Sequence, residues 1–121
     1  MHTQPATAVL IVEDEPMTRE MACQMFSEFG CQSFDAYNGE DALRILSAHP
    51  EIELLFADVR MPGLSGIELA REAQRMRPHL RVVLTSGWLA GAPVPDLPFV
   101  RKPYRLHELR EIVMRAFSRH Q

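Results

Sequence analysis

Several kinds of residue are scarce in this chain, and each scarcity excludes a class of protein. Only two cysteines, Cys23 and Cys31, occur among the 121 residues, which is too few for the disulfide scaffold of a small secreted domain. No apolar run approaches the roughly 20 residues of a membrane-spanning helix, and the first residues lack the basic start and apolar stretch of a signal peptide. We therefore expect a soluble, cytoplasmic protein without membrane insertion.

Basic charge is also scarce. The 13 Lys and Arg residues are outnumbered by 16 Asp and Glu residues, which gives a formal net charge of -3. A chain without a basic field has little attraction for nucleic acid phosphates, and the sequence contains neither a glycine-rich dinucleotide fingerprint nor a P-loop. Apolar residues, in contrast, make up 46% of the chain, which is enough for one domain with a buried core.

Short apolar runs alternate with segments of helical periodicity from residue 8 onward. The runs that predict strands are Ala8–Val12, Gln32–Ala36, Leu54–Ala57, Arg81–Leu84 and Phe99–Arg101. Apolar residues three and four positions apart predict helices after the first, second, third and fifth runs. This alternation is typical of an α/β fold, in which helices cover both faces of a parallel sheet. We expect one domain over residues 8–121, preceded by a flexible tail of residues 1–7.

The segment that follows the fourth run departs from the alternation. From Trp88 to Pro98 it contains three prolines and one glycine, and both residue types disfavour a helix interior. The fourth helix of the alternation is therefore expected to be short or absent.

Charged or hydroxyl residues follow four of the five predicted strands. Glu13 and Asp14 follow the first strand, Asp58 the third, Thr85 the fourth, and Lys102, the single lysine of the chain, the fifth. The carboxyl ends of parallel strands meet at one edge of a sheet, where ligands bind in folds of this type. We therefore expect these side chains to lie close together.

The three carboxylates of this set would repel one another unless they shared a cation, and an oxygen-rich set of this kind suits Mg²⁺. Lys102 supplies a positive charge and Thr85 a hydroxyl donor for an anionic oxygen. An aspartate can attack phosphorus as a nucleophile and form an acyl phosphate. A metal and a lysine would neutralise charge on the transferring group, so the set predicts phosphoryl chemistry.

Four segments together resemble a response-regulator receiver domain of two-component signalling, in the same order and near the same spacing. They are residues 9–15 with the acidic pair, residues 56–66 around Asp58, residues 82–87 with Thr85, and residues 99–104 with Lys102. The similarity runs from about residue 8 to residue 118. It implies a flavodoxin-like fold, which is a doubly wound sheet of five parallel strands in the order 2-1-3-4-5.

The resemblance also implies the roles of the acidic residues. Asp58 would accept a phosphoryl group from a phosphohistidine on a histidine kinase or a histidine phosphotransferase. Asp14 and Asp58 would bind Mg²⁺ directly, together with the backbone carbonyl of Arg60, and Glu13 would help through water. The side chain of Arg60 would lie over the phosphorylation site.

Further roles follow from the same resemblance for the residues after the fourth and fifth strands. Thr85 would hydrogen-bond the phosphoryl group after transfer, and Lys102 would pair with it. Phe99 would be the aromatic switch residue, which turns inward when the hydroxyl moves. The Lys102–Pro103 peptide bond would be cis, a form that proline permits.

The expected function is that of a phosphorylatable signalling module, which catalyses only its own phosphorylation and dephosphorylation and is not a turnover enzyme. It would switch contacts with an unknown downstream protein, as a monomer or weak dimer. In its shortened fourth helix the chain is similar to receivers of hybrid histidine kinases and to some stand-alone receivers. Two alternatives remain open: a pseudo-receiver that binds partners without phosphorylation, and a metal-dependent phosphohydrolase. The second would need a carboxylate at the position of Arg60.

Overall fold

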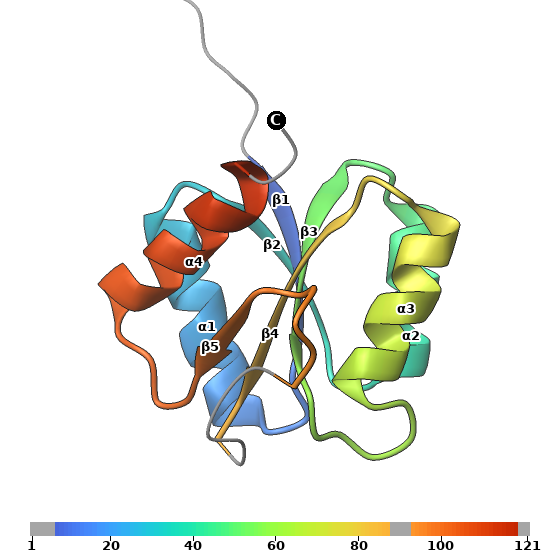
Figure 1. Cartoon of the computed structure of the whole chain (residues 1–121), viewed down its shortest axis with the longest axis horizontal. Helices are drawn as coiled ribbons and strands as arrows, with labels where there is room; N and C mark the ends of the chain where they lie inside the picture. The colour runs from blue at the N-terminus through green and yellow to red at the C-terminus, as the bar shows by residue number, and fades with distance from the viewer. Residues whose placement is uncertain (1–6, 88–92, 119–121) are drawn as a thin grey trace, which may run out of the picture.

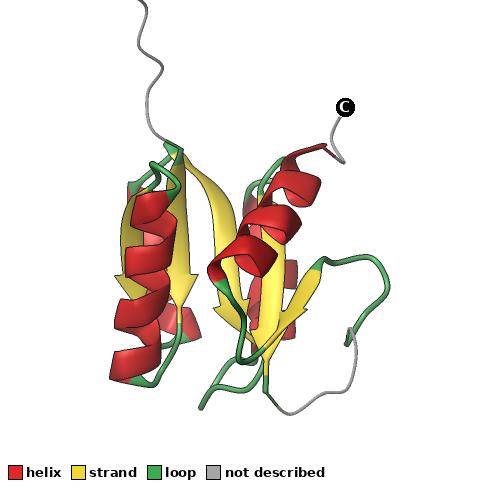
Figure 2. Ribbon diagram, turned by 90° about the vertical axis from the view of Figure 1, so that its left-hand side faces the viewer, coloured by secondary structure: helices red, strands yellow, loops and turns green. Residues whose placement is uncertain are grey.

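A computed structural model of the chain describes residues 7–87 and 93–118. Its strands are β1 (Ala8–Val12), β2 (Gln32–Ala36), β3 (Ile52–Asp58), β4 (Arg81–Ser86) and β5 (Phe99–Arg101). Its helices are α1 (Pro16–Glu28), α2 (Gly39–Ala48), α3 (Gly66–Met76) and α4 (Leu106–Ser118). The strands run parallel (Figure 2), and their order in the sheet is β2-β1-β3-β4-β5. The predicted fold class and strand order are confirmed.

Helices cover both faces of the sheet (Figure 1). α1 and α4 lie on one face, and α2 and α3 lie on the other. The inner strand β1, between β2 and β3, is buried throughout because its side chains alternate between the two cores. Val9 and Ile11 pack with the α1 and α4 side, whereas Leu10 and Val12 pack with the α2 and α3 side. The uninterrupted apolar run in the sequence reflects burial on both faces.

Side chains that accept backbone hydrogen bonds fix the starts of the helices that follow the sheet edge. Glu15 caps α1 by accepting a hydrogen bond from the backbone N–H of Thr18 at 2.6 Å. Asn38 caps α2, and Ser65 caps α3 in a capping box with Glu68. These caps satisfy backbone donors that a helix start leaves free. They also determine where the loops after β1, β2 and β3 end.

The predicted loss of a helix between β4 and β5 concerns residues 88–98. Residues 93–98 form bends and turns without a helix, whereas residues 88–92 lie outside the described residues, as does the predicted tail except for Thr7. The fourth helix of the structure, α4, follows β5. No helix of the described segments is long and apolar enough to cross a membrane.

The segment before β5 is attached to α3 and to the core. Leu97 is buried among the side chains that pack beneath α2 and α3. The carboxylate of Asp96 accepts two hydrogen bonds from the Arg71 guanidinium of α3, at 2.7 and 3.0 Å. The carbonyl of Pro98 accepts a hydrogen bond from the backbone N–H of Leu84 in β4 at 2.8 Å. These contacts position the start of β5, and so the strand end that carries Lys102.

Candidate functional site

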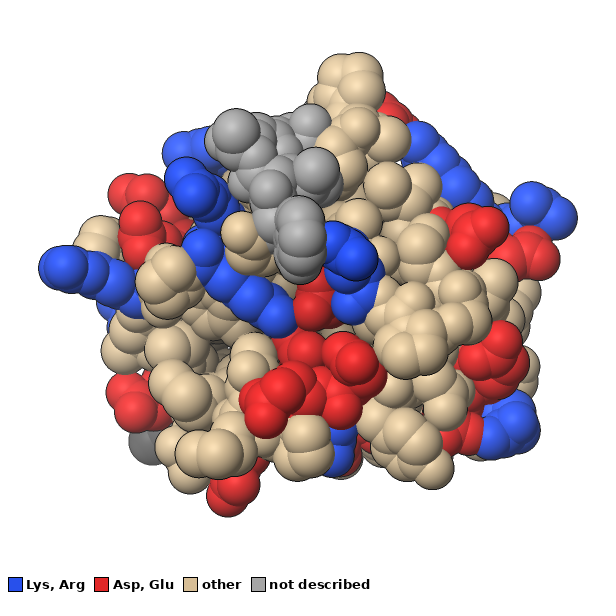
Figure 3. All heavy atoms as spheres, turned by 90° about the horizontal axis from the view of Figure 1, so that it is seen from below, with Lys and Arg blue, Asp and Glu red and all other residues tan. Residues whose placement is uncertain are grey.

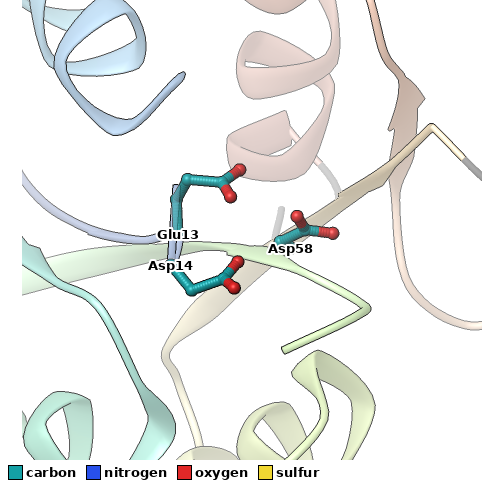
Figure 4. Close-up of side chains that lie close together, drawn as sticks. All are labelled: Glu13, Asp14 and Asp58. Atoms are coloured by element: carbon teal, nitrogen blue, oxygen red, sulfur yellow. The ribbon is translucent and has the colours of Figure 1, made fainter. Parts of the chain in front are cut away.

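The acidic side chains that were predicted to converge lie together at the carboxyl edge of the sheet. Figure 3 shows the molecule from this edge, with Asp and Glu atoms gathered near the centre beside Lys and Arg atoms. Glu13 and Asp14 extend from the loop after β1, and Asp58 ends the neighbouring strand β3 (Figure 4). One carboxylate oxygen from each of the three residues lies within 4.8 Å of the other two.

Strand register places Thr85 beside Asp58. The two residues are partners across β3 and β4, and the backbone N–H of Val59 donates to the Thr85 carbonyl at 2.8 Å. The sequence suggested that Thr85 follows the fourth strand. β4 instead continues to Ser86, so Thr85 lies within the strand. Thr85 is only 1% exposed, and its hydroxyl has no hydrogen-bond partner in the part of the chain that the structure describes.

Lys102 links two of the three carboxylates. Its Nζ donates to Glu13 Oε1 at 2.6 Å and to Asp58 Oδ2 at 2.7 Å. The side chains of Glu13 and Asp58 are only 6% and 9% exposed, so water screens these charges poorly. Asp14 adds a third carboxylate to the group. One ammonium against three carboxylates leaves the site with an excess of negative charge.

Burial and neighbouring charges shift two pKa values in this group. Burial has the largest effect on Glu13 and raises the pKa of its carboxyl, and the charge of Asp58 raises it further, although the hydrogen bond from Lys102 opposes both effects. Burial by itself lowers the pKa of the Lys102 ammonium, but its hydrogen bonds to Asp58 and Glu13 outweigh burial and raise that pKa. Lys102 therefore keeps its positive charge at neutral pH.

The donor set fits a hard divalent cation. Carboxylate and backbone carbonyl oxygens are the ligands that Mg²⁺ prefers. Asp14 is the exposed member of the acidic group, so a hydrated ion can reach it. The backbone N–H of Arg60 donates to Asp58 Oδ1 at 3.2 Å, which holds the main chain of Arg60 next to the acidic group. The structure thus brings together the three carboxylates predicted to hold magnesium, and their binding of the ion stays a prediction.

Two other predicted features lie on the β5 side of the site. Phe99, the first residue of β5, is half-buried and packs against the core beneath α2 and α3. The Lys102–Pro103 peptide bond is cis, as expected. The switching role of Phe99 stays a prediction.

Sequence reasoning did not assign roles to two residues that shape the site. A Cβ atom on Gly66 would lie 2.2 Å from the carbonyl oxygen of Asp58, so the absence of a side chain lets α3 begin against the end of β3. Arg19 of α1 donates from Nη1 to the carbonyl oxygen of Glu13 at 2.8 Å. For Gly66 the sequence did offer a signal, because a glycine directly follows Ser65 where a helix begins. Nothing in the sequence distinguished Arg19 from the other arginines.

Known proteins share both the sequence pattern and the fold of this chain. A family model described as the response regulator receiver domain matches residues 9–95. The chain is 32% identical over 107 residues to the response regulator receiver protein CpdR of Brucella abortus. This alignment covers 84% of the chain and 88% of CpdR. The crystal structure of the receiver domain from the hybrid histidine kinase CckA has a TM-score of 0.77 and 32% identity. The match covers 90% of this chain and 97% of that one.

Other relatives are much longer than this chain. The regulatory protein AtoC of Escherichia coli (strain K12) is 31% identical over 117 residues, which cover 91% of this chain and 25% of AtoC. Across the first three curated relatives, the chain spans between 12% and 46% of their length.

Proposed function

The chain belongs to the response regulator receiver family, and we propose that it is a phosphoacceptor domain whose Asp58 takes a phosphoryl group from a phosphohistidine. The observation that carries this proposal is the position of the Asp58 carboxylate. It lies almost buried at the sheet edge, paired with Lys102 at 2.7 Å and grouped with Glu13 and Asp14. A carboxylate that can act as a nucleophile, a cation and two further carboxylates that could bind a metal thus lie in one place.

The proposed transfer is a displacement at phosphorus. One carboxylate oxygen of Asp58 forms a bond to phosphorus while the phosphorus–nitrogen bond of the donor breaks, and the imidazole nitrogen keeps the bonding electron pair. Lys102 would balance the charge that the phosphoryl group brings. The Thr85 hydroxyl, which is buried beside Asp58 and has no partner among the residues that the structure describes, would donate a hydrogen bond to a phosphoryl oxygen.

Magnesium would be held by the carboxylates of Asp14 and Asp58 and by the backbone carbonyl of Arg60. When bound, the ion supplies positive charge that stabilises the phosphoryl oxygens during transfer. Glu13 would assist through water, which agrees with its carboxylate already accepting a hydrogen bond from Lys102 at 2.6 Å.

The partners that follow from this chemistry are proteins. A histidine kinase or a histidine phosphotransferase would supply the phosphoryl group, and the new charge on Asp58 would bias a conformational equilibrium that a downstream protein reads. We place this exchange in the cytoplasm. Outside this self-modification the chain would turn over no substrate.

Intact mass spectrometry after incubation with acetyl phosphate and Mg²⁺ tests the proposal. We expect one phosphoryl adduct on the wild type, none on Asp58→Asn, and none when the metal is chelated. Asp96→Asn is the matched control, because this carboxylate pairs with Arg71 outside the site and its loss should leave the adduct in place. A wild type that takes neither a phosphoryl group nor beryllofluoride would instead be a pseudo-receiver.

A further inference from the structure

We infer that Arg19 is a positioning residue for the magnesium site, which it serves by holding the main chain of the acidic loop; the inference rests on the proposed function. Arg19 lies in the first half of α1, close in sequence to the acidic pair. Its Nη1 donates to the carbonyl oxygen of Glu13 at 2.8 Å. Its Nε donates to Asp35 Oδ2 on β2 at 3.1 Å.

The carbonyl that Arg19 holds belongs to the peptide unit that joins Glu13 to Asp14. Because a peptide unit is planar, fixing its oxygen also fixes the direction in which the chain continues to the Asp14 Cα. The backbone N–H of Glu13 donates to the carbonyl of Ala36 in β2 at 3.1 Å. The sheet therefore holds Glu13 on its amino side, and Arg19 holds it on its carbonyl side.

The placement of Asp14 depends on this main-chain support. Asp14 is the exposed member of the acidic group, whereas Glu13 and Asp58 are held directly by Lys102. A metal ligand without a rigid side-chain environment needs its backbone fixed if it is to meet the ion at low cost in conformational entropy. Arg19 provides this support from a residue that does not itself touch the ion.

The geometry of Arg19 suits a guanidinium better than an ammonium. Two nitrogens of the planar group bind two acceptors on different elements, the loop carbonyl and Asp35, and the group also lies 5.9 Å from the ring centre of Tyr37. A lysine keeps the charge but has a single nitrogen at the end of a flexible chain. Arg19→Lys therefore separates the effect of the positive charge at this position from the effect of the two hydrogen bonds that orient the loop.

Removal of Arg19 should change magnesium binding in opposite directions, depending on whether Arg19 acts through its charge or by orienting the loop. Arg19 is a cation near a cation site, so if only its charge mattered, its removal would strengthen Mg²⁺ binding. If Arg19 orients the loop, its removal weakens Mg²⁺ binding. The direction of the change therefore identifies the role.

The test compares the full chain with Arg19→Ala, Arg19→Lys and Asp35→Asn by Mg²⁺ titration calorimetry and by amide hydrogen exchange of residues 13–15 in metal-free buffer. We expect Arg19→Ala to bind Mg²⁺ about 10-fold more weakly, as is typical when a partner of a metal ligand is removed. Arg19→Lys and Asp35→Asn should fall between Arg19→Ala and wild type, and all three should exchange faster at Asp14. Arg75→Ala is the charge-matched control, because Arg75 is exposed at the far end of α3.

Each result has a distinct meaning. A wild type that binds no Mg²⁺ overturns the proposed function itself. A wild type that binds Mg²⁺ while Arg19→Lys and Asp35→Asn match it in affinity and exchange overturns only the role of Arg19. Those two conservative variants also decide the matter if Arg19→Ala does not fold. Tighter binding by Arg19→Ala would show that only the charge of Arg19 matters.

Discussion

Asp58 and Thr85 lie side by side at the carboxyl ends of β3 and β4, and the buried Thr85 hydroxyl has no hydrogen-bond partner among the described residues. An unsatisfied buried polar group costs about 1–3 kcal/mol. Within the described residues, the unmodified protein therefore holds a donor next to the proposed phosphoacceptor at an energetic disadvantage. An acceptor attached to Asp58 would remove that disadvantage.

Replacing Thr85 with valine tests this relationship. Valine keeps the branched shape without the hydroxyl, so the free energy of unfolding of unmodified Thr85→Val should be unchanged or higher by about 1 kcal/mol. Beryllofluoride, a phosphoryl mimic, should raise the unfolding temperature of the wild type more than that of the variant. Urea and thermal unfolding with and without the mimic measure both effects. A variant that is already less stable without the mimic would show that the hydroxyl has a partner in the unmodified protein.

A second prediction concerns the pH dependence that Glu13 introduces. Burial raises the pKa of Glu13 above its ordinary value of 4.5, so folding favours its protonated form. The stability from this group is fully present below pH 4.5 and is lost as the pH rises through the raised pKa. In metal-free buffer, the stability of wild type relative to Glu13→Gln should therefore fall as the pH rises through this window. Urea unfolding of both proteins across the window measures the difference, and a constant or rising difference would contradict it.

The convergence of the site residues was predictable because it depends on local order and one topological rule. Glu13, Asp58 and Lys102 each follow or end a recognisable apolar strand, and parallel strands bring their carboxyl ends to the same edge. The ion pairs of Lys102 were not predictable in detail. They depend on distances between side chains that are 44 and 89 residues apart in the chain.

The supporting contacts escaped prediction for a different reason. The chain has 12 arginines (13 basic residues less Lys102), so residue type alone cannot show which of them bind backbone carbonyls. The prolines before β5 predicted the lack of a helix in residues 93–98. They gave no sign that Leu97 would enter the core or that Asp96 would bind Arg71.

Gly66 is expected to be intolerant of even a methyl group. A Cβ atom there would lie 2.2 Å from the Asp58 carbonyl oxygen and 2.9 Å from the Val59 Cα. Helix propensity alone predicts that Gly66→Ala stabilises α3 by about 1 kcal/mol, whereas the clash predicts a loss of about 1–3 kcal/mol. Urea unfolding shows whether Gly66→Ala raises or lowers the free energy of unfolding. Gly87→Ala is the control, because among the described residues its Cβ would meet only Lys102 Cβ at 3.7 Å, an ordinary contact.

Arg77 joins three elements at the opposite edge of the sheet. Its guanidinium donates to the carbonyls of Leu46 at 2.9 Å, His49 at 3.3 Å and Pro50 at 3.3 Å, and also to that of Ile52. These carbonyls lie at the end of α2 and the start of β3, where a helix end leaves acceptors free. Arg77→Ala should therefore lower the free energy of unfolding by about 2 kcal/mol, as measured by urea unfolding.

Two further variants separate the contacts of Arg77 from its charge. Arg75→Ala removes the same charge from an exposed side chain that pairs with Glu72 at 3.0 Å, and it should change stability by less than about 0.5 kcal/mol. Arg77→Lys should recover only part of the loss, because one ammonium cannot reach carbonyls on both α2 and β3. Magnesium affinity should stay the same in all three variants, since Arg77 lies at the amino edge of the sheet. Equal stability of Arg77→Ala and Arg75→Ala would mean that water satisfies these carbonyls equally well.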